Sequence, residues 1–326
     1  MKRKPIIALA WLCLCLVFGA ALMQGSGGLL WQMEPALAKL LLLEYRLPAA
    51  VMAVLAGASL ALSGLFMQNV FRNPLAGPFV LGISSGASLG IALVVLAGAG
   101  LPFAFSGAPI KALAAIGGAL LMLMLNVVVY GRLKSTVALL IFGILAGHFV
   151  SAIVESLQYM ASGADIRNFL LWGMGNLQVA GWVPHFMIGL VLLASWYTGQ
   201  RVHGAMDVYQ LGDDYARSLG LNLNGYRKSL MWLTALMAGC VTAWCGPLSF
   251  VGLVVPHLAR MLLGTALHRY LITGTALLGA LFMLTAHLIS LLPLSNTELP
   301  VNVICSILGA PLVMLLLLRN KNLLLE

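Results

Sequence analysis

A single carboxylate and its polar neighbours are the first candidates for chemistry in this sequence. Glu155 is the only acidic residue inside the apolar segments that are long enough to cross a membrane. His148, Ser151 and Tyr159 follow helical spacing around it, so all four side chains are expected on one face of a helix. A carboxylate that faces hydrocarbon is costly. The four residues are therefore expected either to line a polar pathway or to satisfy one another in a contact between helices.

A second group of charged residues lies in the polar segment 200–229. Beginning at Leu211, the chain reads Leu-Gly-Asp-Asp-Tyr-Ala-Arg-Ser-Leu-Gly. Asp213 and Asp214 near the start of a short helix, and Arg217 near its end, have the charge order that a helix dipole favours. Gly220 suits the position after the last helical turn. We expect a short capped helix, which either docks against another protein or is an ordinary surface helix.

Several other kinds of chemistry are not expected. The nearest approach to a phosphate-binding loop, Gly220–Ser229, displaces Lys228 by two residues from the position that the motif requires. The five cysteines lie in apolar runs without zinc-like spacing. The net charge of +9 includes no basic stripe. We therefore expect no nucleotide hydrolysis, metal, cofactor or nucleic acid on this chain.

The composition indicates which elements must position these residues. Of the 326 residues, 61% are hydrophobic and 8% are charged, whereas a soluble domain has about 25% charged residues. The fold class is therefore an all-α polytopic membrane protein. A crossing helix needs about 20 mostly apolar residues, and ten segments satisfy this: 5–24, 47–68, 79–100, 109–131, 136–161, 182–199, 230–246, 250–267, 271–292 and 299–319. Pro256 interrupts the eighth, which is expected to be short, broken or re-entrant.

The basic residues predict the orientation of the chain. With the N-terminus inside, the cytoplasmic side carries 14 of the 18 Lys and Arg residues, as the positive-inside rule requires. Ten crossings then place both termini in the cytoplasm. Segment 5–24 has the charge pattern of a signal peptide but is expected to remain as the first span. Residues 1–326 are expected to form one transmembrane domain with a cytoplasmic loop at about 200–229.

Two local motifs predict how the helices begin and pack. Asn73 and Pro74 suit an N-cap and the first position of a helix. Gly82, Gly86 and Gly90 recur every four residues, a doubled GxxxG pattern that predicts a very close contact between two helices.

Five stretches, together and in this order, resemble the FecCD family of ABC importer permeases. They are Tyr45–Pro48; Phe71–Pro78 with Leu81, Gly82, Gly86 and Ala87; Leu211–Gly220; Gly246–Arg260; and Glu298–Val301 with Leu308–Pro311. The resemblance implies a type II importer permease of ten helices in a bacterial inner membrane. It also implies a second permease copy or paralogue, cytoplasmic subunits that use ATP and Mg²⁺, and an extracytoplasmic substrate-binding protein. The implied cargo is an iron chelate, a ferric siderophore first, with haem or cobalamin as alternatives.

The resemblance also assigns roles to residues of this chain. Contact with the ATPase would fall to Leu211, Gly212, Asp213, Asp214, Tyr215, Ala216, Arg217 and Gly220. The pathway helix would be the one with the polar stripe at His148, Ser151, Glu155 and Tyr159. Ser135 and Thr136 would form the cytoplasmic gate, and 166–171 the outer gate helix. Arg46 would hold the binding protein.

The sequence departs from the family at the outer side. Where the family commonly has Ala-Asp-x-x-Ala-Arg, this chain reads Ala286-His287-Leu288-Ile289-Ser290-Leu291. Ala49 and Leu291 stand where the cobalamin permease has arginines that hold the binding protein, so specificity for cobalamin is not supported.

Two rival classes remain as alternatives. An ion-coupled secondary transporter working without an ATPase would use Glu155 and His148 as titrating groups. An intramembrane enzyme would need a paired catalytic constellation, and the sequence offers none.

Overall fold

The computed structural model describes residues 3–25, 28–96, 108–133, 135–292 and 299–319. Nearly all of its regular structure is helical. The helices are α1 (Arg3–Met23), α2 (Pro35–Leu41), α3 (Leu47–Phe71), α4 (Ile83–Val95), α5 (Ala108–Leu133), α6 (Thr136–Met160), α7 (Gly163–Gly173), α8 (Val183–Gln210), α9 (Asp213–Ser218), α10 (Leu223–Cys245), α11 (Val251–Leu263), α12 (His268–Ser290) and α13 (Val301–Arg319). The minor elements are an antiparallel pair β1 (Gln24–Gly25) and β2 (Gly28–Leu29), the 3₁₀ turns η1 (Leu30–Gln32) and η3 (Pro78–Leu81), and the π-helical turn η2 (Leu42–Arg46).

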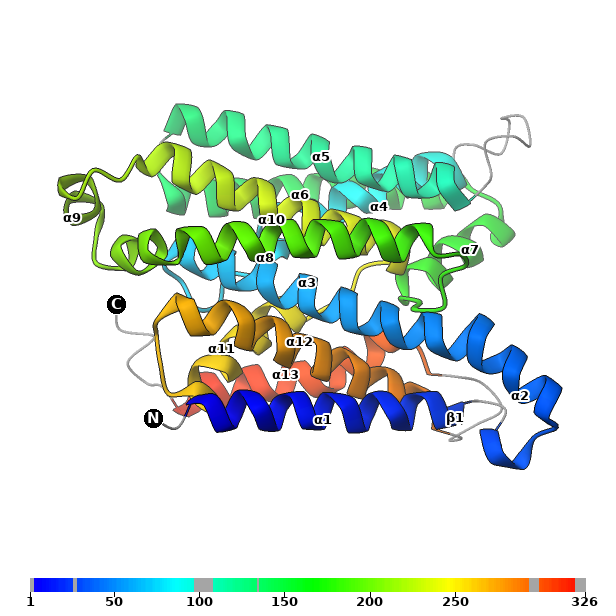
Figure 1. Ribbon diagram of the computed structural model, residues 1–326. Helices are drawn as coiled ribbons and strands as arrows, with labels where there is room; N and C mark the ends of the chain where they lie inside the picture. The colour runs from blue at the N-terminus through cyan, green and yellow to red at the C-terminus, as the bar shows by residue number, and fades with distance from the viewer. Residues whose placement is uncertain (1–2, 26–27, 97–107, 134, 293–298, 320–326) are drawn as a thin grey trace.

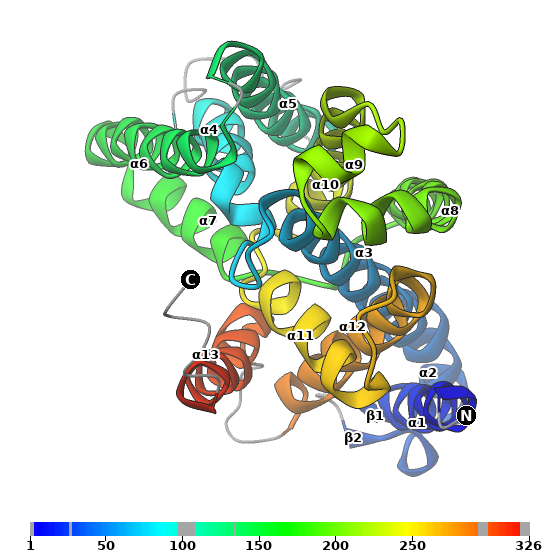
Figure 2. The ribbon, with the colours of Figure 1, turned by 90° about the vertical axis from the view of Figure 1, so that its left-hand side faces the viewer.

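The long helices run roughly side by side as one bundle (Figure 1). Figure 2 looks onto the end that carries α9 and shows α3 at the centre, with α8 and α10 on one side and α11 and α12 on another. The apolar window of α3 is 83% buried, against 17% for that of α1. A helix that is apolar all round belongs in a core, and α3 occupies that place.

Each of the ten predicted spans overlaps a helix of the described chain. Within the described residues, five helices are long and apolar enough to cross a membrane: α1, the continuous helix Pro35–Phe71, α5, α6 and α12. The beginning of α1 and the end of α13 lie at the same end of the bundle as α9 (Figure 1). This is the arrangement that an even number of crossings requires.

Two predicted loops are shorter than the sequence suggested. Residues 35–46, expected in a loop, continue α3 outwards through α2 and η2 as one helix of 37 residues. The wide turn η2 lies directly before Pro48, whose ring cannot take part in the regular hydrogen-bond pattern. The predicted loop 200–229 is also too long, because α8 continues to Gln210 and α10 begins at Leu223.

The interruption in the eighth span lies before α11 and not at Pro256. Pro256 is buried inside α11, which has 13 residues and is about 20 Å long, short of the roughly 30 Å of a bilayer core. Phe250, with φ of 64°, precedes the helix. Figure 1 places α11 in the half of the bundle nearer to α9.

Irregular backbone joins α10 to α11 before the eighth span, and polar groups at its two ends bond to other parts of the protein. Asn302 Oδ1 accepts a hydrogen bond from the Ser249 backbone nitrogen at 2.9 Å. The carbonyl oxygen of Cys245 accepts one from the Asn176 nitrogen at 2.9 Å. Non-helical backbone at membrane depth is tolerated where protein satisfies it in this way.

Asn73 and Pro74 begin a turn and not a helix, contrary to the sequence-based expectation. Asn73 Oδ1 accepts from the Leu75 nitrogen at 2.9 Å, and the Asn73 carbonyl accepts from Ala76 at 3.1 Å. These local bonds close a single turn. The following helix, α4, begins only at Ile83, after Gly82 with φ of 65°.

The glycine pattern of α4 packs against α5 as predicted. A methyl group added at Gly86 would lie 2.3 Å from the carbonyl oxygen of Gly118, and one added at Gly90 would lie 1.9 Å from that of Ala114. Such contacts are possible only where side chains are absent. Gly82 lies outside α4, and its positive φ forms the bend that precedes the helix.

Neighbouring glycines of α5 provide a matched test of this contact. A methyl group at Gly118 would lie 1.9 Å from the Gly86 carbonyl oxygen, whereas one at Gly117 would meet nothing within 4 Å. Gly118→Ala is expected to destabilise the protein by about 1–3 kcal/mol through overpacking. Gly117→Ala should be neutral or slightly stabilising. Thermal unfolding in detergent measures both, and equal midpoints for the two variants would contradict the packing.

Candidate functional site

Helix α9 is short and capped at both ends by glycine. Gly212, with φ of 124°, precedes it. At the other end the nitrogens of Gly220 and Leu221 donate to the carbonyls of Arg217 at 2.9 Å and Ala216 at 3.0 Å. This is the Schellman arrangement, and Gly220 has the positive φ of 84° that it requires. The predicted short capped helix at 211–220 is therefore present.

One face of α9 is anchored and the other faces outwards. Ala216 is fully buried, while Leu211, Tyr215 and Leu219 are 67%, 51% and 58% exposed. Tyr215 and Leu219 are four residues apart, and Leu211 precedes Gly212 at the end of α8; we call these three exposed apolar side chains the outer strip of α9. Arg217 lies on the surface with its guanidinium 3.5 Å from the fully exposed carboxylate of Asp214.

Asp213 is less exposed than Asp214: its side chain is 31% exposed, whereas that of Asp214 is fully exposed. The Asp213 carboxylate accepts two hydrogen bonds from Arg227 Nη2, at 2.8 and 2.7 Å, and one from Arg72 Nη2 at 2.5 Å. Arg72 follows α3 and Arg227 lies in α10. We call this group of three residues the Asp213 clamp. It fixes α9 to the central helix and to α10.

Two tyrosines contact the arginines of the clamp. Arg227 Nε donates to the hydroxyl of Tyr209 at 2.6 Å, and Nη1 donates to that of Tyr130 at 2.6 Å. Arg72 donates through Nε to the Tyr209 carbonyl at 3.0 Å and lies 4.1 Å from the centre of its ring. Arg227 is only 6% exposed, and a buried cation requires such partners. The side chains connect α9 with α5, α8, α10 and the end of α3.

The protonation of Asp213 follows from these contacts. Burial by itself raises the pKa of Asp213, but hydrogen bonds from Arg227 and then Arg72 outweigh it, and the pKa lies below its usual value. The clamp is therefore an ion pair at neutral pH.

A second polar network lies deeper in the bundle. Asp207 Oδ1 is 2.6 Å from His268 Nδ1, and His268 Nε2 is 3.2 Å from Asn69 Nδ2. Tyr226 donates its hydroxyl to Asn69 Oδ1. The network joins α3, α8, α10 and α12, and neither it nor the clamp was predicted. Their members are far apart in sequence, so only the fold brings them together.

The polar stripe of α6 separates into two parts. Ser151 and Glu155 line a groove of about 330 Å³ together with Gln158. Its other polar walls come from α4, which contributes Ser84, Ser85 and Ser88. His148 is exposed and Tyr159 is 93% exposed on the same helix, but neither lines the groove. Glu155 forms no ion pair among the described residues.

The residues predicted as gates occupy helix starts. Ser135 caps α6 through its hydroxyl, which accepts from the Ala138 nitrogen at 3.3 Å. Thr136 is the first residue of α6, and its side chain lies outside the described residues. Residues 166–171 lie in α7 as expected, and α7 is capped by Ser162. Their gating roles stay predictions.

Arg46 forms its hydrogen bonds inside the protein, and its docking role stays a prediction. Its guanidinium donates to the carbonyls of Leu22 at 3.3 Å, Met23 at 2.8 Å and Gly28 at 2.9 Å, and the residue is 7% exposed. An arginine fork fits such a cluster of acceptors at the end of a helix. The geometry therefore gives no support to a docking role for Arg46.

Comparisons with known proteins agree with this architecture. The profile of the FecCD transport family matches residues 7–319. The chain belongs to the FecCD transport family. It is 36% identical over 286 residues to the hemin transport system permease protein HmuU of Yersinia pestis, covering 86% of this chain and 84% of the relative. It is 38% identical over 289 residues to the vitamin B12 import system permease protein BtuC of Serratia proteamaculans, covering 88% and 84%.

A solved structure also resembles the whole bundle. It is described as a metal-chelate type ABC transporter in an inward-facing conformation, and it matches with a TM-score of 0.88 at 27% identity, covering 97% of this chain and 99% of its own. The fold and family expected from the sequence are thus confirmed. The chain is a permease of an ABC importer, and its role is transport.

Neighbouring aspartates of α9 allow a matched test of the clamp. Asp213→Asn leaves the buried Arg227 without its carboxylate and is expected to cost about 1–3 kcal/mol of folding free energy. Asp214→Asn, at a fully exposed side chain, should change little. Thermal unfolding of both variants measures this, and equal midpoints would refute a structural clamp.

The same variants predict a pH dependence. A carboxylate with a lowered pKa stabilises the fold fully above its usual pKa and loses this contribution as the pH falls through the lowered value. The difference in midpoint between wild type and Asp213→Asn should therefore shrink between pH 7 and about pH 3.

Proposed function

We propose that this chain is the membrane-spanning permease subunit that carries an iron chelate, a ferric siderophore, across the bacterial cytoplasmic membrane into the cell. A separate cytoplasmic ATPase uses ATP and Mg²⁺, and the permease performs no bond chemistry. Membership of the FecCD transport family supports the class of transporter. Relatives named for hemin and vitamin B12 make haem and cobalamin the alternative cargoes.

The outer strip of α9 is the observation that supports a contact with the ATPase. Leu211, Tyr215 and Leu219 are all more than half exposed, although the helix that presents them is held rigidly by the clamp. Contiguous apolar and aromatic side chains on a surface that faces water mark a site of protein contact. Arg217 and Asp214 supply a charged rim beside the strip.

The clamp supplies the route by which such a contact acts on the bundle. When ATP draws two ATPase subunits together, a docked α9 moves with its own subunit. Asp213 is bonded to Arg72 and Arg227, so the inner ends of α3 and α10 follow. Because α3 is the central helix, its displacement changes the packing of the whole subunit and alternates access to the pathway.

A second copy of the chain, or a close paralogue, is proposed to cover the side on which α6 and α13 lie (Figure 2). Both helices expose large apolar residues, among them Phe149 at 69% and Met314 at 63%. The Glu155 groove opens on α6, so pairing would leave it facing the pathway between the two subunits. The binding protein would dock at the opposite end from α9, where α2 projects from the bundle (Figure 1).

The rival, an ion-coupled transporter working alone, receives less support from the geometry. It would use His148 and Glu155 together, yet among the described residues that line the groove Glu155 is present and His148 is not.

Capture of the ATPase tests the proposal directly. The tagged permease, co-expressed with the ATPase from its own operon, is expected to purify as a complex whose ATP hydrolysis in lipid rises with loaded binding protein. Arg217→Glu reverses a charge that is 65% exposed on α9 and should abolish this stimulation while the permease still folds. Arg269→Glu, at another exposed residue, is the control. Normal coupling in Arg217→Glu, or transport driven by an ion gradient without any ATPase, would overturn the assignment.

The pathway role of Glu155 has its own test. Glu155→Gln removes the single carboxylate of the groove and is expected to change the transport rate severalfold while complex assembly stays normal. Ser156→Ala is the matched control, because Ser156 is the next residue and its hydroxyl bonds to its own helix at Ala152. Transport rates in proteoliposomes give the answer. An unchanged rate in Glu155→Gln would make the carboxylate a packing residue.

A further inference from the structure

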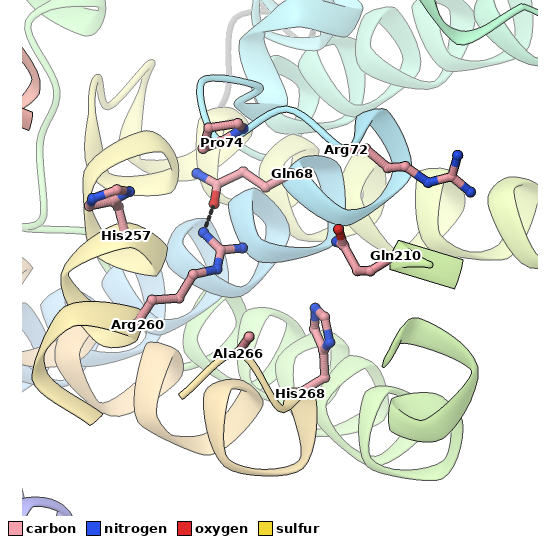
Figure 3. A pocket seen from close by; sticks show the side chains of 8 residues that line it. All are labelled: Gln68, Arg72, Pro74, Gln210, His257, Arg260, Ala266 and His268. Carbon is pink, nitrogen blue, oxygen red and sulfur yellow. Dashed lines mark hydrogen bonds between the residues drawn. The ribbon is translucent and has the colours of Figure 1, made fainter. Parts of the chain in front are cut away.

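A second cavity, of about 330 Å³, opens at the α9 end of the bundle between α3, α8, α11 and the start of α12 (Figure 3). Among the described residues that line it, the charged and titratable ones are all basic. They are Arg72, His257, Arg260 and His268, and two amides, Gln68 and Gln210, lie beside them. No role has been given to this cavity so far, and it is separate from the Glu155 groove.

Two of the basic side chains already bond to carboxylates. Arg72 is paired with Asp213, and its guanidinium points away from the other labelled side chains (Figure 3). His268 Nδ1 lies 2.6 Å from Asp207 Oδ1. Both side chains are therefore committed to partners within the protein.

Arg260 differs from both. It forms no ion pair among the described residues. Its Nη1 donates to Gln68 Oε1 at 2.6 Å, and Gln68 in turn donates through Nε2 to the Leu253 carbonyl at 3.0 Å. The amide is therefore oriented so that its oxygen holds the guanidinium at the cavity wall. The arginine is fixed in position by a neutral partner, and its positive charge is left uncompensated.

The remaining donors point to the kind of ligand. A guanidinium has five N–H donors, and the bond to Gln68 uses one of them. His257 and Gln210 line the same cavity from α11 and from the end of α8, and Figure 3 shows them on opposite sides of Arg260. Donors from three elements thus line one cavity, and arginine binds phosphate through paired hydrogen bonds.

We propose that this cavity binds a phosphate group, held by Arg260 with His257 and Gln210. The source is either a soluble phosphate or the headgroup of an anionic phospholipid, since both present the same chemistry. The bound group neutralises Arg260 and joins the inner ends of α8 and α11 beside α3. Arg72 belongs to both the cavity wall and the Asp213 clamp. An occupied cavity therefore stabilises the clamp that holds α9. The proposal does not depend on the identity of the cargo or on the ATPase.

The test uses the purified full chain in a maltoside detergent, which contains no phosphate. Thermal unfolding followed by tryptophan fluorescence is measured in two arms at constant ionic strength. One arm titrates inorganic phosphate against chloride, and the other adds phosphatidylglycerol against a neutral glycolipid. A ligand that binds only the folded protein raises the midpoint with concentration, and the concentration dependence gives the dissociation constant.

Arg260→Gln should weaken binding by about tenfold or more, as the loss of charge-assisted hydrogen bonds predicts. Arg269→Gln, at an exposed arginine nearby, should bind as wild type does. A response to phosphate alone identifies the soluble source, and a response to phosphatidylglycerol alone identifies the lipid.

Either of two results overturns the proposal: no rise in either arm, or an equal rise in Arg260→Gln. The first is also what a cavity reserved for an acidic side chain of a partner would give. If Arg260→Gln does not purify in folded form, the double variant His257→Ala/Gln210→Ala decides instead. It keeps the bond between Arg260 and Gln68, and an unweakened response in it would equally reject the site.

Discussion

Close contact of helix backbones around α3 is the constraint on which the rest of the structure depends. In lipid, association of helices relies on packing rather than on the exclusion of water, so small residues are needed where helices meet. A methyl group at Gly57 would lie 2.2 Å from the Gly279 carbonyl of α12, and one at Gly64 would lie 1.7 Å from that of Gly252 in α11. Two helices are thus held against the centre at backbone distance. Such close contact would pass the proposed displacement at the end of α3 on to both helices.

Polar groups in this charge-poor chain gather at the α9 end of the bundle. The Asp213 clamp, the network through His268 and the cavity at Arg260 all lie at this end, and α3 and α8 or the residues directly after α3 contribute to each. Each is a paired or hydrogen-bonded arrangement, because isolated charges are too costly in such surroundings. The permease therefore combines an apolar bundle with one polar end, and that end carries the helix proposed to meet the ATPase.

The sequence predicted the helices and the family well, and it predicted individual side chains less well. Apolar runs located ten of the helices, and glycine spacing predicted that α4 has a close helix neighbour, because these signals are local. Arg46 bonds to three carbonyl oxygens from earlier segments of the chain, which its local sequence does not indicate. Asp213 and Asp214 look equivalent in sequence, yet one is clamped by two arginines and the other is fully exposed. No local pattern could separate them.

By itself, the sequence determined that this is a helical membrane permease with a short capped helix at 211–220 and a carboxylate on α6. Composition and periodicity decide the membrane class and the two local features, since each depends on neighbours within a few residues, whereas the permease follows from the five stretches that resemble the family. Tertiary structure alone decided that α3 is central, that Glu155 shares its groove with serines of α4, and that Arg260 faces a cavity without a carboxylate. Each of these features joins residues tens to hundreds of positions apart. Only packing of the folded helices brings such residues within contact distance.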